Sequence, residues 1–287
     1  MSETVYILDG HSQIYRAYYA PFRDLTSPTG EPTRATYVFC TMLLKVIAER
    51  RPRYLAIAAD GPAEKLLRRR EYPQYKSSRP PMPEDMLPQV RRIFQIVEAM
   101  GIPVLRVEGY EADDIIATVA DRFAGPETDV MIVSRDKDLD QLVGEHVRLY
   151  DPMKDEVLDV AAIESAKGYR PDQAVEVQTL TGDKTDDIPG VQGVGPKTAA
   201  KLITQYGGLD GIFANVDAQT PKLKQNLIEH EATARSNFDL MVLHRDAPIE
   251  VDLGVLTVDP DRDETRRLFD FLEFKSLHDR LYEALGA

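Results

Sequence analysis

Short apolar runs rich in β-branched residues alternate with longer segments of helical periodicity through residue 150. The apolar runs fall at positions 5–8, 54–58, 104–107, 130–133 and 147–150. Between them, residues 33–49, 87–100 and 112–123 repeat apolar side chains with the period of an amphipathic helix. This order predicts an α/β fold in which helices flank a mostly parallel central sheet.

Two segments interrupt the alternation. Residues 61–88 contain six prolines and therefore cannot form one regular helix. From about Tyr169 onward the strand pattern disappears, and helices separated by glycine turns follow. We therefore predict an α/β core at 1–168, which carries the proline-punctuated stretch at about 62–88, and a C-terminal helical part at 169–287.

The charge of the chain disfavours a nucleic-acid partner at first sight. Its 287 residues include 35 Lys and Arg against 48 Asp and Glu, a net charge of −13. No apolar run approaches the length of a membrane span, and the N-terminus is too acidic for a signal peptide. The single cysteine, Cys40, cannot form an internal disulfide. We expect a cytoplasmic protein with no membrane association.

Carboxylates follow the predicted strands. Asp9 closes the first strand and Asp60 follows the second, while further acids come after the third and fourth strands. In open α/β sheets the functional crevice lies outside the carboxyl ends of the strands, so these side chains should converge. The predicted cluster consists of Asp9, Asp60, Glu111, Asp113, Asp114, Asp136 and Asp138.

Such a cluster implies bound cations. Carboxylates packed together repel one another, and burial raises their pKa values until some are protonated unless a cation neutralises them. An all-oxygen ligand set favours Mg²⁺ or Mn²⁺, since zinc usually recruits His or Cys. Two such ions can stabilise both the attacking and the leaving oxygen of a phosphodiester displacement.

Helix capping offers a simpler explanation for the same acids. Asp and Glu are favoured at helix N-termini, so the sequences EADD and DKD could be caps alone. Capping does not explain why Asp9 and Asp60 both close apolar strands. The recurrence at four strand ends therefore favours the metal site. The five histidines are scattered along the chain and suggest no role.

A glycine turn marks the helical part. Gly193, Val194 and Gly195 precede Pro196, which suits the first position of a helix that continues through Lys197 and Thr198. Exposed N–H groups at such a helix start bind phosphate oxygens without reading sequence. We therefore expect these residues to contact the backbone of duplex DNA. A plain helical hairpin is the alternative.

The same segment rules out a Walker loop and adds two carboxylates. Pro196 stands where the Walker lysine must follow directly, and no strand leads into the turn. Upstream lie Asp183 and Asp186, and an acidic pair beside a phosphate-binding turn suggests bridging metal. We assign both as further metal ligands.

The stretch after Asp60 is basic. Between Pro62 and Pro80 there are six cations and two anions, with Tyr72 and Tyr75 among them. This arrangement is typical of segments that follow a single strand by charge and base stacking. A solvated surface loop is the alternative. The expected nucleic-acid contacts are Arg68, Arg69, Arg70, Tyr75, Lys76 and Arg79.

These motifs resemble those of the 5′-nuclease family found at the N-terminus of bacterial DNA polymerase I, within the flap endonuclease superfamily. The resemblance covers the whole chain and is most specific in EADD at 111–114, DKDL at 136–139, and the segment from Tyr75 to Pro83. It implies a PIN-like 5′-nuclease fold with a helix-three-turn-helix at about 182–206. It also implies a Mg²⁺-dependent nuclease that removes 5′ flaps and RNA primer ends and cuts nicked or gapped duplexes.

The resemblance also implies roles for individual residues. One metal ion would be surrounded by Asp9, Asp60, Glu111, Asp113, Asp114 and Asp136, and a second by Asp138, Asp183 and Asp186. The basic stretch corresponds to the family's helical arch, in which the expected catalytic cations Arg68, Lys76 and Arg79 would face the threaded strand. The helix-three-turn-helix would grip the duplex and hold K⁺ through carbonyl oxygens. A polymerase domain in cis and a monomeric state are further implications.

Two other functions remain open from the sequence. A non-catalytic module that binds branched DNA would carry the acidic patch as a structural feature. A PIN-type ribonuclease would share the acidic sheet edge but usually lacks the glycine turn and the long basic stretch. Metal-dependent cleavage of flap DNA and of single-stranded RNA would separate these from a 5′-nuclease.

Overall fold

A computed structural model describes residues 3–285. Its main sheet has six strands in the order β3-β2-β1-β4-β5-β6. The first five are parallel and match the predicted strands; they are β1 (Glu3–Asp9), β2 (Tyr54–Ala58), β3 (Val104–Leu105), β4 (Thr128–Val133) and β5 (Val147–Asp151). β6 (Glu156–Leu158) was not predicted, and it pairs antiparallel to β5 at the edge. The predicted mostly parallel α/β sheet is confirmed.

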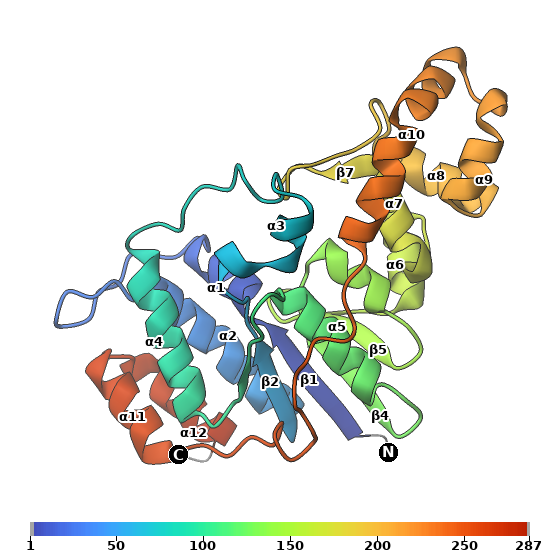
Figure 1. The fold of residues 1–287 in the computed structure, drawn as a ribbon. Helices are drawn as coiled ribbons and strands as arrows, with labels where there is room; N and C mark the ends of the chain where they lie inside the picture. Colours follow the sequence, from blue (N-terminus) through green and yellow to red (C-terminus); the bar gives the residue numbers. More distant parts are fainter. Residues whose placement is uncertain (1–2, 286–287) are drawn as a thin grey trace.

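Helices cover both faces of this sheet (Figure 1). Side chains alternate along β1, so that Val5 and Ile7 enter one core while Tyr6 and Leu8 enter the other. The first core contains α5 (Ala112–Phe123), and the second contains α1 (Gly10–Tyr18), α2 (Arg34–Arg50) and α4 (Met86–Ala99). Helices α2, α4 and α5 match the predicted helices to within one residue at each end.

The strand register brings the carboxyl ends of three strands together. Asp9 pairs with Ala58 across β1 and β2, and Leu8 pairs with Val133 across β1 and β4. The loops that follow these strands therefore leave the sheet side by side. This places the acidic residues after β1, β2 and β4 at one edge.

The proline-punctuated stretch crosses over this edge as an irregular arch (Figure 1). It contains a 3₁₀ turn, η1 (Ala63–Lys65), and the short helix α3 (Leu67–Glu71), and then runs as turns until α4 begins. The prolines prevent a continuous helix here, as predicted. We refer to residues 62–85 as the arch.

Helix α6 (Val160–Lys167) is the last element before residue 169, and the helical part begins with η3 (Pro171–Gln173) and α7 (Ala174–Thr181). A two-stranded ribbon, β7 (Gly182–Asp183) and β8 (Ile188–Pro189), then leads to the glycine turn. Pro196 is the first residue of α8 (Pro196–Tyr206), with Gly195 as its N-cap. The remaining elements are α9 (Leu209–Ala214), η4 (Val216–Ala218) and α10 (Pro221–Met241).

After α10 the chain returns to the α/β core. Leu55 donates a backbone hydrogen bond of 2.9 Å to Leu256, which ties the returning segment to β2. The last helical elements are α11 (Arg262–Phe271), η5 (Lys275–Leu277) and α12 (His278–Leu285). Phe269 and Leu281 are buried in the same core as α2 and α4. The C-terminal end of the predicted helical part therefore packs on the α/β core.

Within residues 3–285, no helix combines the length and the apolar character that crossing a membrane requires.

Candidate active site

An acidic cavity of about 380 Å³ opens where the parallel strands end. Five of the predicted strand-end carboxylates line it together with Asp186 from the helical part and two cations from the arch. These lining residues are Asp9, Asp60, Asp113, Asp136, Asp138, Asp186, Lys76 and Arg79. The fold thus gathers acids from five separate chain segments and places two cations of the arch in the same cavity.

The centre of the cavity is suited to a metal ion. Carboxylate oxygens of Asp113, Asp136 and Asp138 lie within 4.8 Å of one another. The buried Oδ1 of Asp138 has no hydrogen-bond partner among the described residues. A buried carboxylate oxygen without a partner is costly, and a bound cation would satisfy it. The oxygen-only donor set suits Mg²⁺ or Mn²⁺.

Electrostatics also call for a cation. Burial raises the pKa of Asp9 to about 7, and repulsion from Asp136 and Asp60 adds to this rise. Burial and the charge of Asp136 likewise raise the pKa of Asp138 to about 7. The pKa of Asp113 is raised well above its usual range by burial and by the neighbouring carboxylates. Without metal, the cavity therefore binds protons near neutral pH.

Capping and site formation use some of the same side chains. Asp9 caps α1 by accepting from the Ser12 N–H at 3.2 Å, and Asp136 caps η2 (Lys137–Leu142) by accepting from the Asp138 N–H at 3.0 Å. Glu111 caps α5. Asp113 and Asp138 follow these caps, and their side chains reach the cavity. Capping thus fixes where the acidic loops begin but does not account for the cluster.

Asp60 lies at the rim of the cavity, beside a histidine that the sequence did not single out. Its Oδ1 accepts from the Ala112 N–H at 2.8 Å, which ties it to the start of α5. Its Oδ2 lies 3.2 Å from Nδ1 of His11. Burial lowers the pKa of His11, although Asp60 acts in the opposite direction. His11 is a cavity residue that sequence reasoning missed, although it lies two residues after Asp9.

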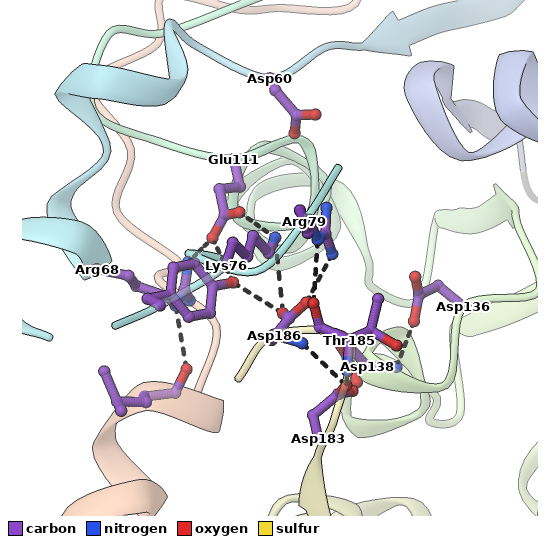
Figure 2. A network of polar contacts seen from close by, with 12 residues as sticks. Asp60, Arg68, Lys76, Arg79, Glu111, Asp136, Asp138, Asp183, Thr185 and Asp186 are labelled. Carbon is purple, nitrogen blue, oxygen red and sulfur yellow. Dashed lines mark hydrogen bonds and ion pairs between the residues drawn. The ribbon is translucent and has the colours of Figure 1, made fainter. Parts of the chain in front are cut away.

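Asp183 is the last residue of β7, and Asp186 lies in the loop before β8. Cations neutralise both, and Figure 2 shows Arg79 and Lys76 on Asp186. Lys137 Nζ lies 2.8 Å from Asp183. Burial opposes ionisation of Asp183, but Lys137 and two backbone N–H groups outweigh it and lower its pKa. Asp186 accepts from Arg79 at 2.6 Å, and Lys76 Nζ lies 3.6 Å away.

Two of the three predicted catalytic cations face the cavity. The backbone N–H of Lys76 donates to the Asp186 carbonyl at 3.0 Å, and Lys76 adopts a left-handed conformation with φ of 54°. This turn directs its ammonium group to Glu111 as well as to Asp186 (Figure 2). Although burial opposes its charge, these carboxylates raise the pKa of Lys76. Arg79 lies on the same wall.

Three predicted site residues do not make the contacts that the sequence suggested: Arg68, Asp114 and Tyr75. Arg68 is buried against Glu111 and Asp114 and does not face an open channel. Asp114 is outside the group of carboxylates that could share an ion. Tyr75 is only 4% exposed, and its hydroxyl donates to Glu111 at 2.9 Å and to Asp186 at 3.0 Å. Its ring is therefore not available to stack on a base in this arrangement.

The remaining predicted contacts divide between the arch and the glycine turn. Arg69 donates to the Lys76 carbonyl at 3.0 Å, and Arg70 is exposed. At the glycine turn, Gly193 has a φ of 78°, and the buried Val194 anchors the turn. The exposed or half-exposed positions there are Gly193, Gly195, Lys197 and Thr198. This surface belongs to the helical part, apart from the acidic cavity (Figure 1).

Comparison with known proteins gives two adjoining family matches. Residues 4–168 match the family described as 5′-3′ exonuclease, N-terminal resolvase-like domain. Residues 169–264 match the family described as 5′-3′ exonuclease, C-terminal SAM fold. Together the two matches span most of the chain.

Individual relatives agree with these matches. A 5′-3′ exonuclease from Aquifex aeolicus is 38% identical over 96% of this chain and 94% of its own length. DNA polymerase I from Rhizobium leguminosarum is 37% identical over 98% of this chain, but the chain spans only 28% of that protein. A solved structure of the bacteriophage T5 flap endonuclease with DNA and metal ions covers 94% of this chain and 100% of its own, with 19% identity and a TM-score of 0.69.

Proposed function

Because the chain belongs to the 5′-3′ exonuclease family, we propose that it is a divalent-metal-dependent 5′-nuclease. Its substrates are DNA structures with a 5′ flap, a nick or a gap, and it acts as a 5′-3′ exonuclease and flap endonuclease. The observation that carries this proposal is the acidic cavity, in which three carboxylates converge within 4.8 Å and two arch cations line the same space.

The proposed ligands form two groups. Asp113, Asp136 and Asp138 would hold a first ion, with Asp9 and Asp60 lining the same cavity. Glu111, which Arg68, Tyr75 and Lys76 hold, would reach this ion after releasing Lys76. Asp183 and Asp186 would contribute to a second. When bound, Mg²⁺ or Mn²⁺ supplies a water of lowered pKa and stabilises the charge that develops on the phosphate. We thus propose that the protein uses two ions and that these are Mg²⁺ or Mn²⁺.

The arch cations have a separate task. Lys76 and Arg79 line the cavity and carry positive charge, so they would bind and orient the scissile phosphate. In the structure they lie on Glu111 and Asp186. Substrate phosphate would take over those contacts, and the two carboxylates would then be free to bind metal.

Duplex DNA would lie on the glycine turn. The N-terminus of α8 and Lys197 present positive potential, and Gly193 and Gly195 let a phosphate approach the backbone closely. We also propose K⁺ as a ligand of the carbonyl oxygens in this turn. We further propose that the protein cuts RNA primer ends paired with DNA and that a polymerase domain is present in cis. We also propose that it is monomeric and cytoplasmic. In this proposal, residues 1–168 form the nuclease core and residues 169–287 form the DNA-binding part.

Denaturing gels of end-labelled substrates test the activity. We expect metal-dependent cleavage of 5′-flap and nicked DNA with Mg²⁺ or Mn²⁺ and none with chelator. Asp136→Asn should abolish cleavage while preserving much of the flap affinity, and Asp121→Asn, an exposed acid on α5, serves as the matched control. Full cleavage by Asp136→Asn would refute the assignment. Flap binding without cleavage would indicate a binding module, and preference for single-stranded RNA would indicate a PIN-type ribonuclease.

A further inference from the structure

Arg68 is a saturated hydrogen-bond donor in the interior of the protein. It lies on α3 at the base of the arch and is only 4% exposed. Its Nε donates to the Leu240 carbonyl at 3.1 Å. One terminal nitrogen donates to Glu111 and to Asp114, and the other to Asp114 and to the Val242 carbonyl, at 2.7–3.0 Å. All five N–H bonds of the guanidinium are therefore engaged by protein.

Asp114 is equally committed. It is 1% exposed, and both of its oxygens accept from Arg68 in a bidentate pair. The same oxygens accept from the Glu111 N–H at 3.1 Å and from the His244 N–H at 2.9 Å. A carboxylate with four donors has little capacity left for a metal ion.

The pair joins three segments that are distant in the sequence. Arg68 belongs to the arch, Glu111 and Asp114 belong to the start of α5, and Leu240 and Val242 belong to the end of α10 and the segment after it. Figure 2 shows Arg68 reaching the Glu111 carboxylate beside the acidic cavity. The start of α5 also carries Asp113, one of the three converging carboxylates.

We propose that Arg68 and Asp114 are positioning residues that hold the start of α5 in register with the end of α10, and that they contact neither metal nor DNA. This inference rests on the proposed nuclease function. Through this pair, the placement of α10 determines the placement of Glu111 and Asp113. The pair thereby links the part of the protein that contains the duplex-binding turn to the acidic cavity.

The geometry favours this role over direct DNA contact. A phosphate could bind Arg68 only if it displaced Asp114 or Glu111, and either would then be a buried carboxylate without its cation. The planar fork of arginine matches the carboxylate at two points and reaches both carbonyls. Lysine keeps the charge but cannot make these contacts together. Loss of fit should therefore weaken the metal site even when the charge is retained.

The test uses the DNA-free protein, so it does not depend on cleavage. We would measure Mn²⁺ affinity by calorimetry and amide hydrogen exchange in residues 240–244 for Arg68→Met, Arg68→Lys and Asp114→Asn. Arg91→Met changes an exposed arginine on α4, outside the arch, and is the control. We expect Mn²⁺ affinity to fall about tenfold in Arg68→Met, less in Arg68→Lys, and not in Arg91→Met. Amide hydrogen exchange at residues 240–244 should accelerate most in Arg68→Met, less in Arg68→Lys and not in the control variant.

A kinetic comparison adds a second readout. At saturating flap DNA and moderate Mg²⁺, the positioning role predicts that kcat of Arg68→Lys falls while KM changes little. Unchanged Mn²⁺ affinity and exchange in Arg68→Met, together with weaker flap binding in Ca²⁺, would show direct DNA contact and overturn the inference. If Arg68→Met does not fold, the isosteric Asp114→Asn decides by the same measurements. Failure of the wild-type protein to cut DNA would refute the proposed function but leave the Mn²⁺ and exchange results interpretable.

Discussion

The hydroxyl of Ser134 donates a hydrogen bond of 2.9 Å to Oδ2 of Asp9. The same hydroxyl oxygen accepts from the Asp136 N–H at 3.1 Å. Ser134 is fully buried at the end of β4, so it fixes a carboxylate from β1 against the loop that carries Asp136. One small side chain thus aligns two of the proposed ligands.

Ser134→Ala should weaken metal binding. The bond from Ser134 lowers the pKa of Asp9, so its loss raises that pKa further and leaves Asp9 more protonated at pH 7. We expect the Mg²⁺ concentration for half-maximal cleavage to rise about tenfold at pH 7 and less at pH 8.5. Thr36→Val, which removes a buried hydroxyl without a hydrogen-bond partner among the described residues, is the control. An unchanged Mg²⁺ requirement would contradict this role.

Tyr75→Phe separates two roles for that side chain. Phenylalanine keeps an aromatic ring that could stack on a base, but it removes the hydroxyl that bridges Glu111 and Asp186. We expect slower cleavage and a loss of about 1 kcal/mol in the free energy of unfolding. Single-turnover kinetics and urea unfolding measure the two effects. Wild-type cleavage by Tyr75→Phe would instead support stacking.

The metal-free protein should lose stability as pH rises. Asp9 and Asp138 have folded pKa values of about 7 against an ordinary value of 3.8. Their bound protons stabilise the folded chain fully below about pH 4, and this contribution is lost as pH rises through about 7. In chelator, Tm should therefore fall between pH 5.5 and 8, and Asp138→Asn should reduce that fall. Mg²⁺ should raise Tm more at pH 8 than at pH 5.5, and equal increases would argue against metal at these carboxylates.

Chelation should weaken DNA binding as well as stop cleavage. Without a divalent ion, the carboxylates of the cavity repel phosphate. We expect flap DNA to bind several-fold more weakly in chelator than in Ca²⁺ at the same ionic strength. Fluorescence anisotropy measures this difference, which should shrink in a variant that combines Asp136→Asn with Asp138→Asn. Equal affinity in chelator and Ca²⁺ would count against a metal-filled cavity.

The sheet and the acidic edge could be predicted because both follow from local patterns. Apolar runs of five and four residues, at 54–58 and 130–133, identify β2 and β4, and parallel strands necessarily end at one edge. Asp9, Asp60 and Asp136 therefore lie near one another for reasons that are visible in the sequence. The strands β6, β7 and β8 have only two or three residues each, too few to show alternation.

The partners of the arch could not be predicted in the same way. A basic stretch with tyrosines suggests contact with nucleic acid, but the sequence does not show which of its faces is packed. The Arg68–Asp114 pair spans 46 residues and depends on the end of α10, which lies far along the chain. His11, Ser134 and Lys137 did leave a signal, because each lies within two residues of a predicted ligand.

The return of the chain to the α/β core after α10 limits how the helical part can move. Residues between α6 and α11 leave the sheet and come back to it, so two chain crossings connect this part to the α/β core. Helices α7, α8 and α10 also share one buried cluster with α5, and together these attachments resist free swinging. It also means that a shortened chain ending after α10 would lack α11 and α12, which would uncover the apolar side chains of α2 and α4.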